Sequence, residues 1–274
     1  MIDFRKIWDR IAYALVEAVF PTKCLVCGEF FSPPQREDML WEDLQDITYQ
    51  RLMAPFLCPT CLPGFSPVES PICSKCGIMF RSRDGEDRVC SNCSMTPGRF
   101  RMARALGIYN DQTFKKAIHS YKYDEKIQLA RPFEKLLFSV FIRHWNKNDI
   151  DLVMPVPLHI KRFRERGFNQ AYHLIRHWPR IAEKLDIDLS VMRIERNVIF
   201  KTKKTKPQAT LKGKDRKKNL AGAFSVKNAH KIRGKRILLV DDVFTTGTTA
   251  DECVKELLKN GAEYVDIITL ARRM

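Results

Sequence analysis

The sequence predicts an α/β fold, in which helices cover both faces of a parallel sheet and a small cysteine-rich module precedes the sheet. Short aliphatic runs, such as Ile237–Val240, alternate with stretches of helical periodicity, and this alternation predicts the sheet. Eight of the nine cysteines form four C-x-x-C pairs, and these predict the module. We therefore expect an N-terminal helix in residues 1–20, a double zinc ribbon in 21–98 and the α/β domain in 99–274.

The first predicted element is an amphipathic helix from Asp3 to Phe20, which has one apolar stripe and ends at Pro21. Its polar face mixes acidic and basic residues, which favours packing on its own protein over binding to a membrane surface. No secretory leader is recognised, and no apolar run reaches the roughly 18 residues that a membrane span requires. These features predict a cytoplasmic protein without a transmembrane segment.

The cysteine pairs have the spacing of zinc knuckles. Two knuckles complete one tetrahedral site, so four knuckles predict two structural zinc ions. Pairing in sequence order is the simplest arrangement, and crossed pairing stays open. Disulfides or a redox motif are weaker alternatives, because cytoplasmic thiols stay reduced and no pair opens a thioredoxin-like helix. The region is rich in proline and has few periodic segments, so metal binding is expected to drive its folding. The eight expected ligands are Cys24, Cys27, Cys58, Cys61, Cys73, Cys76, Cys90 and Cys93.

The elements of the α/β domain follow from hydrophobic periodicity. Asn260 and Gly261 predict the end of the last helix, since glycine readily takes a positive φ there. A short helix is also expected at 37–52, within the cysteine-rich region. The expected strands lie at 105–109, 152–154, 191–194, 236–240 and 264–270, and the expected helices at 111–120, 126–145, 168–185 and 250–259.

A hydroxyl-rich loop follows the strand at 236–240 and leads into a helix. The free N–H groups and the dipole of a helix start suit a phosphate. Asp241 and Asp242 would repel a phosphate, so they are expected to bind sugar hydroxyls or a hard cation such as Mg²⁺. An ordinary capped turn is the simpler alternative, but two acids and four threonines exceed what capping requires. The residues expected to hold the phosphate are Thr245, Thr246, Gly247, Thr248 and Thr249.

The net charge of +16 indicates an anionic ligand or partner. Most of this charge lies between Arg193 and Arg236, a segment that contains sixteen Lys or Arg residues and only two acidic residues. Apart from Phe200 this segment has little aromatic content, so nucleic acid is expected to be bound through its phosphates and released by salt. A merely solvated basic loop within 201–218 is the alternative.

Five motifs occur in a fixed order, and together they resemble the ComF family of competence-associated proteins. The last motif is by itself similar to the phosphoribosyl-pyrophosphate loop of type I phosphoribosyltransferases. The resemblance covers residues 20–274 and implies a type I phosphoribosyltransferase-like fold behind a zinc ribbon. The motifs are PVPLH at 155–159, RERGFNQA at 164–171, TKPQ at 205–208, RKKN at 216–219 and LLVDDVFTTGTT at 238–249.

The resemblance also implies a ligand, phosphoribosyl pyrophosphate with Mg²⁺, and a role for each matching residue. Asp241 and Asp242 would be catalytic and bind the ribose hydroxyls, directly or through Mg²⁺. Lys122 matches a lysine that the family often has nearby. The reaction that such a site suits is the displacement of pyrophosphate from C1 of the ribose. The residues implied on the pyrophosphate side are Pro155, Val156, Pro157, Leu158, His159, Arg166, Lys203 and Gln208.

Three functions fit these features. The first is a DNA-uptake protein that binds single-stranded DNA and phosphoribosyl pyrophosphate, with an uptake helicase or channel as a further partner. The second is an active phosphoribosyltransferase of nucleotide metabolism with an unidentified acceptor. The third is a zinc-ribbon adaptor with a vestigial site. The intact acid pair and threonine loop disfavour the third function. The basic segment favours the first, and the lack of a recognisable general base disfavours base salvage.

Overall fold

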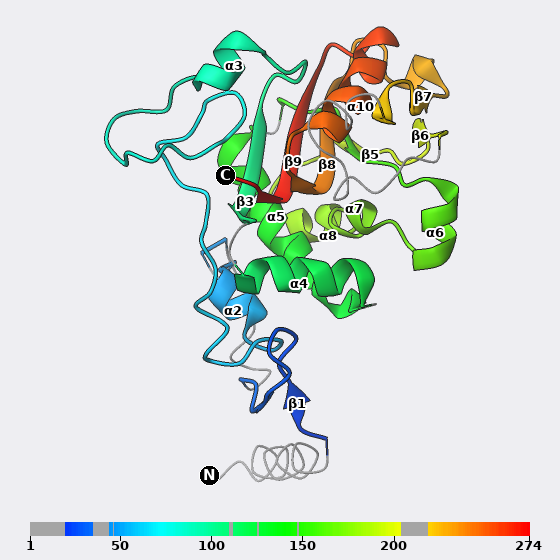
Figure 1. Ribbon diagram of the computed structural model, residues 1–274. Helices are drawn as coiled ribbons and strands as arrows, with labels where there is room; N and C mark the ends of the chain where they lie inside the picture. The colour runs from blue at the N-terminus through cyan, green and yellow to red at the C-terminus, as the bar shows by residue number, and fades with distance from the viewer. Residues whose placement is uncertain are drawn as a thin grey trace.

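The computed structural model describes residues 20–34, 44–45, 47–109, 112–124, 126–146, 148–203 and 219–274. Five strands form one sheet: β3 (Ala103–Ile108), β4 (Leu152–Pro155), β5 (Arg193–Ile194), β8 (Arg236–Phe244) and β9 (Tyr264–Arg272). All neighbours pair in parallel, in the order β3-β9-β8-β4-β5 (Figure 1). The predicted α/β class with a parallel sheet is confirmed.

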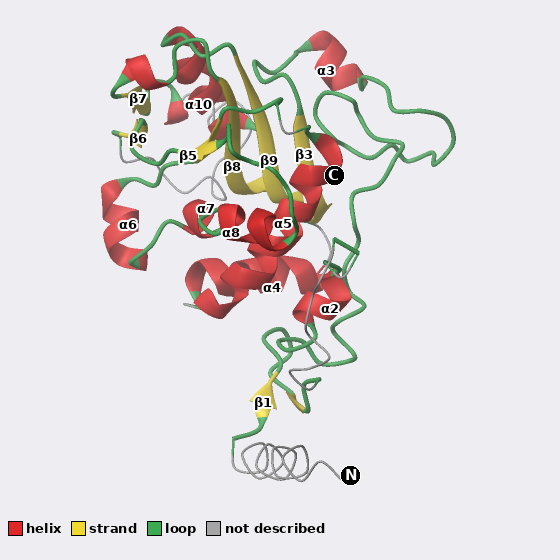
Figure 2. Cartoon of the chain, turned by 180° about the vertical axis from the view of Figure 1, so that it is seen from behind, coloured by secondary structure: helices red, strands yellow, loops and turns green. Residues whose placement is uncertain are grey.

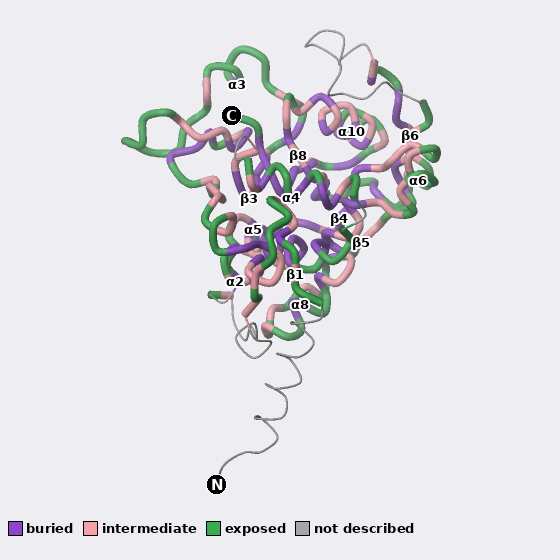
Figure 3. Tube along the Cα trace, turned by 60° about the horizontal axis from the view of Figure 1, so that its bottom comes forward, coloured by how far each residue is buried: buried purple, intermediate pink, exposed green. Residues whose placement is uncertain are grey.

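The long central strands β8 and β9 form the middle of the sheet. The aliphatic run Ile237–Val240 is fully buried, as expected for a strand covered on both faces (Figure 3). Leu239 lies opposite Met154 on β4 and Ile267 on β9. Since all strands run in one direction, their carboxyl ends share one edge, and ligands of such sheets bind there.

One face of the sheet is covered by α4 (Gln112–Tyr123), α5 (Ala130–His144), α7 (Gln170–His173) and α8 (Trp178–Lys184), with the 3-10 turn η2 (Ile127–Leu129) before α5 (Figure 2). Large aromatic side chains fill this core. Phe141 stacks on Trp178 with ring centroids 5.0 Å apart, and Phe138 meets Trp178 edge-on at 5.5 Å. The same core receives Leu238 and Val240 from β8.

The other face of the sheet is covered by α10 (Thr248–Lys259), which buries Cys253, Val254 and Leu257. Beside it, β6 (Ile199–Lys201) and β7 (Phe224–Val226) form a two-stranded antiparallel sheet, followed by the 3-10 turn η4 (Ala229–Lys231). Helix α6 (Ile160–Arg166) follows β4 and contains no buried residue. The expectation of helices on both faces is therefore confirmed.

The cysteine-rich region packs directly against the sheet domain. Its elements are β1 (Thr22–Lys23), β2 (Phe30–Phe31), α2 (Tyr49–Met53) and α3 (Ser91–Met95). Tyr49 of α2 stacks on Phe65 at 3.9 Å, and both rings meet Phe114 of α4 edge-on. Further along, the Ala103 N–H donates to the Lys75 carbonyl at 2.7 Å, so this region also covers the free edge of β3.

Several element boundaries differ from the sequence-based expectation. Strand β8 continues through both aspartates to Phe244, and α10 begins two residues earlier than expected. The single helix expected at 168–185 is wrong: it is two short helices, because Pro179 cannot continue a helix and instead lies in the first turn of α8. Helix α4 continues through Tyr123, and the helix expected at 126–145 begins as η2.

Two expectations fall partly or wholly outside the described residues. The helix expected from Asp3 to Phe20 lies outside them apart from its last residue. Half of the helix expected at 37–52 does as well, and the described part of this region contains α2. The sequence did not predict the strand pair β6 and β7, because each strand is only three residues long.

Candidate phosphate site and cysteine clusters

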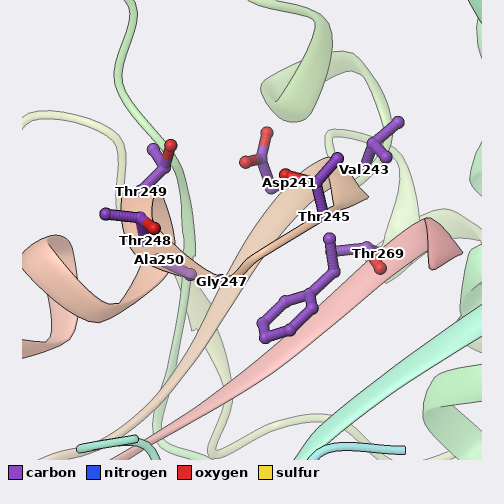
Figure 4. A pocket seen from close by; sticks show the side chains of 9 residues that line it. Asp241, Val243, Thr245, Gly247, Thr248, Thr249, Ala250 and Thr269 are labelled. Atoms are coloured by element: carbon purple, nitrogen blue, oxygen red, sulfur yellow. The ribbon is translucent and has the colours of Figure 1, made fainter. Parts of the chain in front are cut away.

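The hydroxyl-rich loop lies at the carboxyl edge of the sheet, between β8 and α10. A small hollow opens there, lined by Asp241, Val243, Phe244, Thr245, Gly247, Thr248, Thr249, Ala250 and Thr269 (Figure 4). Gly247 is the N-cap of α10 and has no side chain to occupy the free N–H groups of the first turn. The Thr246 and Thr248 hydroxyls lie 2.8 Å apart and hold the loop in shape. The loop thus directs unpaired N–H groups and hydroxyls into the hollow.

Gly247 is required at this position for two reasons. Its φ of +71° is in the left-handed region that other residues rarely adopt. A Cβ atom here would also lie 2.6 Å from the Phe244 ring, well inside van der Waals contact. The Phe244 ring therefore forms the floor on which the loop rests.

The two aspartates occupy different surroundings, although they are adjacent in the sequence. Asp241 is half-buried and lines the hollow, on the α10 side of the sheet. Burial and the neighbouring Asp242 carboxylate raise the pKa of Asp241 to about 7, against the influence of Lys122. Among the described residues, no cation forms an ion pair with Asp241. Its carboxylate is thus available to a ligand.

Asp242 points to the opposite side of the sheet and is buried. Its carboxylate forms an ion pair with Lys122 of α4 at 2.7 Å and accepts a hydrogen bond from the Gln170 amide at 3.1 Å. Burial would lower the pKa of Lys122, but the Asp242 and Asp241 carboxylates outweigh it and raise the pKa. Sequence reasoning placed both acids at the ligand, whereas this geometry places Asp242 behind Asp241 in a closed polar cluster.

The PVPLH stretch, residues 155–159, connects β4 to α6 beside the end of β8. The Val156 N–H donates to the Val240 carbonyl at 2.8 Å, and the Asn169 amide donates to the Val156 carbonyl at 3.1 Å. His159 is the N-cap of α6, and its Nδ1 accepts from the Lys161 N–H at 3.3 Å. Pro155 and Val156 are buried, while Pro157, Leu158 and His159 are partly exposed. None of the five lines the hollow at the loop.

The remaining residues expected on the pyrophosphate side are spread out. The Arg166 guanidinium lies over the Tyr123 ring at 4.6 Å. Lys203 is exposed, and its ammonium donates to the Ala221 carbonyl at 3.4 Å. Gln208 lies outside the described residues. Lys201 lies beside this stretch, because its backbone forms a parallel β-bridge with His159. Burial and Arg162 lower the pKa of Lys201, and they outweigh Cys253 and Asp241, which act to raise it.

The eight cysteines come together in two groups of four. Each group joins consecutive knuckles, Cys24 to Cys61 and Cys73 to Cys93, with all ligand atoms within 4.8 Å of one another. Sulfur–sulfur distances of 3.6 Å in the first group and 3.8 Å in the second fit thiolates about 2.3 Å from a tetrahedral zinc ion, which lie about 3.8 Å apart. The sequential pairing is therefore the one that the structure forms.

Backbone donors favour the thiolate form of one cysteine in each group. Burial would raise the pKa of Cys73, but the N–H groups of Cys76 and Cys90 lower it to about 6. The same balance lowers the pKa of Cys24 to about 6. Since zinc binds thiolates, these residues fit the metal that their spacing predicts.

Comparisons with known proteins find a matching domain family and several relatives. Residues 169–274 match the model of the phosphoribosyl transferase domain. The chain is 29% identical to competence protein ComFC of Bacillus subtilis over 260 residues, which is 91% of this chain and 94% of the relative. It is 29% identical to competence protein F of Haemophilus influenzae over 206 residues, 74% of this chain and 85% of the relative.

The chain belongs to the ComF family. Another relative is the DNA utilization protein YhgH of Escherichia coli K12, 25% identical over 221 residues, 80% of this chain and 91% of the relative. In this ComF protein, no described helix is both long and apolar enough to cross a membrane.

Two site residues of this ComF protein escaped sequence reasoning, although each carries a signal. Gln170 belongs to the RERGFNQA motif, and the structure shows that it binds Asp242. Lys122 was noted without a role, and its position in the last turn of α4 places it under the end of β8. A lysine on an otherwise apolar helix face is the signal that could have identified this buried pair.

Proposed function

We propose that this ComF protein acts in DNA uptake, binding phosphoribosyl pyrophosphate with Mg²⁺ at the Thr245–Thr249 loop and single-stranded DNA on a basic surface. The names of its relatives, two competence proteins and a DNA utilization protein, support the DNA-uptake role. The phosphoribosyl transferase domain match supports the ligand.

One observation carries the ligand proposal: the uncapped start of α10 and the unpaired Asp241 carboxylate line the same hollow. The N–H groups and threonine hydroxyls bind the 5′-phosphate. Asp241 accepts hydrogen bonds from the ribose hydroxyls or binds Mg²⁺, which neutralises the pyrophosphate when it is present. Asp242 does not touch the ligand and instead keeps the end of β8 in place through Lys122.

Calorimetry with phosphoribosyl pyrophosphate and Mg²⁺ tests this site. We expect wild-type protein to bind, and Asp241→Asn to weaken binding by roughly 10- to 100-fold, since a charge-assisted bond contributes about 1.5–3 kcal/mol. Asp84→Asn, which changes an exposed aspartate in the cysteine-rich region, is the matched control and should bind as wild type. Equal binding by Asp241→Asn and wild type would exclude Asp241 from the site.

An active phosphoribosyltransferase with an unidentified acceptor is the second candidate. The specific observation in its favour is Asp241, whose pKa of about 7 lets it accept a proton near neutral pH. Pyrophosphate release from phosphoribosyl pyrophosphate, measured with a panel of nucleobases and with single-stranded DNA, distinguishes an enzyme from a binding protein. Release that survives Asp241→Asn would place catalysis elsewhere.

We also propose that two structural zinc ions occupy the two cysteine groups. Metal analysis of the purified chain should give two zinc equivalents, and a chain with one equivalent would exclude one of the groups. Each ion would join two knuckles that lie apart in the sequence, so it would stabilise the fold of the cysteine-rich region.

The DNA surface is proposed on α6 and the adjoining end of α4. Helix α6 carries Lys161, Arg164 and Arg166 and leaves Phe163 43% exposed. Next to it, Tyr123 is 56% exposed and carries the Arg166 guanidinium on its ring. Exposed rings between cations suit single-stranded nucleic acid, because bases stack on the rings and phosphates meet the charges.

Fluorescence anisotropy with a labelled 20-nucleotide oligo-dT tests this surface. Tyr123→Ala and Phe163→Ala should each weaken binding by roughly 5- to 100-fold, the range for losing one stacked base. Phe30→Ala is the matched control, since Phe30 is also exposed and also has a cation, Lys23, over its ring. Binding that is insensitive to salt and to both α6-side substitutions would contradict the proposal.

A further inference from the structure

The second cysteine group contacts the sheet domain through a buried arginine. Arg272, the last residue of β9, is 6% exposed. Its guanidinium donates to the Cys76 carbonyl oxygen and to the Cys76 Sγ, the latter at 3.2 Å. Among the described residues, no carboxylate forms an ion pair with Arg272. A zinc ion with four thiolates carries a net charge of −2, so the zinc-loaded group supplies the counter-charge that buried Arg272 otherwise lacks.

Arg272 also touches the floor of the phosphate loop. It lies opposite Phe244 in the β8–β9 register, and its guanidinium sits 4.8 Å from the Phe244 ring centroid. The tip of this ring abuts Gly247, where a Cβ atom would lie 2.6 Å from the Phe244 Cζ atom. A continuous line of contacts therefore runs from Cys76 through Arg272 and Phe244 to the start of α10.

A second set of contacts joins the same two places. Directly after the second cysteine group, the Arg99 N–H and guanidinium both bind the Asp251 carboxylate, at 2.7 and 2.5 Å. Asp251 lies in the first turn of α10, and its N–H donates to the Gly247 carbonyl at 2.8 Å. Phe100 meets the Phe244 ring edge-on at 5.8 Å. The second group is thus held to the loop by both charge and packing.

Among the described residues, the first cysteine group has no such connection. Cys24 and Cys58 belong to the core on the opposite face of the sheet, with α4 and α5. Phe244 and Ala250 belong to the other core, with Cys73, Cys76 and Cys93. In Figures 1 and 2, β1 of the first group lies far from β8 and α10. The first cysteine group therefore serves as an internal control for the second.

We infer that Arg272 is a positioning residue that couples zinc in the second cysteine group to phosphate-ester binding at the Thr245–Thr249 loop. This inference rests on the proposed function of that loop. Coupling between two sites is reciprocal. If zinc in the second group strengthens ligand binding at the loop by some factor, a ligand in the loop must strengthen zinc binding in the second group by the same factor. The first group is uncoupled.

Zinc release from the intact two-zinc protein tests the coupling without any enzyme assay. Zinc is competed from the protein at equilibrium by a chelator of increasing concentration, a zinc-sensitive dye records the release, and peptide mapping of alkylated cysteines assigns each step to one group. The probe is ribose 5-phosphate, at a concentration shown by calorimetry to saturate the wild type. We expect it to tighten zinc binding by Cys73, Cys76, Cys90 and Cys93 about fivefold or more and to leave the first group unchanged.

A pair of neighbouring substitutions sharpens the test. Arg272→Met removes the buried guanidinium and should abolish the protection, while Arg273→Met, at an exposed neighbour, should retain it. If Arg272→Met does not fold, the wild-type comparison still decides. Saturating ribose 5-phosphate with unchanged release from both groups would overturn the coupling alone. Absence of ribose 5-phosphate binding to the wild type would overturn the proposed loop function and the coupling with it.

Discussion

At the scale of single residues, the adjacent acids Asp241 and Asp242 have different roles. The Asp242 charge is neutralised inside the protein by Lys122, whereas Asp241 lines the hollow without an ion pair among the described residues. An unpaired, half-buried carboxylate is unfavourable for folding, and such residues are typical of binding sites. The strand alternation that sends the two side chains to opposite faces is the physical origin of this division.

The raised pKa of Asp241 predicts a pH-dependent effect of Asp241→Asn. The folded-state pKa of about 7 exceeds the usual 3.8, so the contribution of Asp241 to stability is fully present below about pH 4 and is lost as the pH rises through 7. The Asp241→Asn variant does not lose stability in this way, because asparagine does not ionise. Relative to wild type, the variant should gain up to about 4 kcal/mol of unfolding free energy between pH 4 and pH 8, and less where solvent screens the half-buried carboxylate. Urea unfolding at several pH values measures this, and a pH-independent difference would contradict it.

Gly247 predicts a loss of ligand binding from one added methyl group. Gly247→Ala suffers both the positive φ and the clash with the Phe244 ring. Gly234→Ala is the matched control, because Gly234 has a similar φ of +66° but no atom within 4 Å of the added Cβ. Both variants should lose about 1 kcal/mol of stability to the backbone strain. Only Gly247→Ala should lose ribose 5-phosphate affinity in calorimetry, and equal affinities would show that the loop tolerates displacement.

At the scale of elements, α4 supports the carboxyl end of β8 through Lys122. Lys122→Met leaves the Asp242 carboxylate buried without its partner, and breaking a buried pair in this way costs about 3 kcal/mol or more. Lys116→Met, at an exposed position on the same helix, should change the unfolding free energy by less than about 0.5 kcal/mol. Urea unfolding compares the two variants. Similar midpoints would mean that water or another group replaces Lys122.

Element order was predictable from the sequence, but element ends were less so. Ile237–Val240 reads as a strand buried on both faces, and it is one. The strand continues through Asp241 and Asp242 because β9 and the buried ion pair hold it, and these are contacts across the fold that periodicity does not encode. Similarly, the break before α8 is stabilised by Glu134 of α5, which accepts from the His177 N–H and Nδ1.

At the scale of the whole molecule, the cysteine-rich region and the sheet domain share their hydrophobic cores. Tyr49 and Phe65 complete the aromatic cluster around Phe114, and the second cysteine group joins the core that contains Phe244. The composition shift near residue 98 is visible in the sequence, and we expected a double zinc-ribbon module to end there. Nothing local in the sequence reveals that residues before it pack against residues after it.

This packing predicts that the sheet domain is unstable alone. A fragment of residues 99–274 exposes Phe114 and the edge of β3, and it leaves Arg272 without its partner. It should melt at least 10 °C below the full chain, since several kcal/mol of packing are lost. A fragment of residues 21–274 keeps all of these contacts and is the control. Circular dichroism melting compares them, and equal midpoints for both fragments would show that the shared core contributes little.

The strand order has a consequence for how the protein is made. β9 follows the other four strands of the sheet in the chain, yet it lies between β3 and β8, pairing Ala103 with Ile267. A nascent chain that has not reached residue 264 therefore holds two incomplete sheet halves, each with an open edge that attracts other strands. Only β9 closes the gap and brings Arg272 to Cys76. Until β9 has left the ribosome, both open edges are exposed to pairing with strands of other chains.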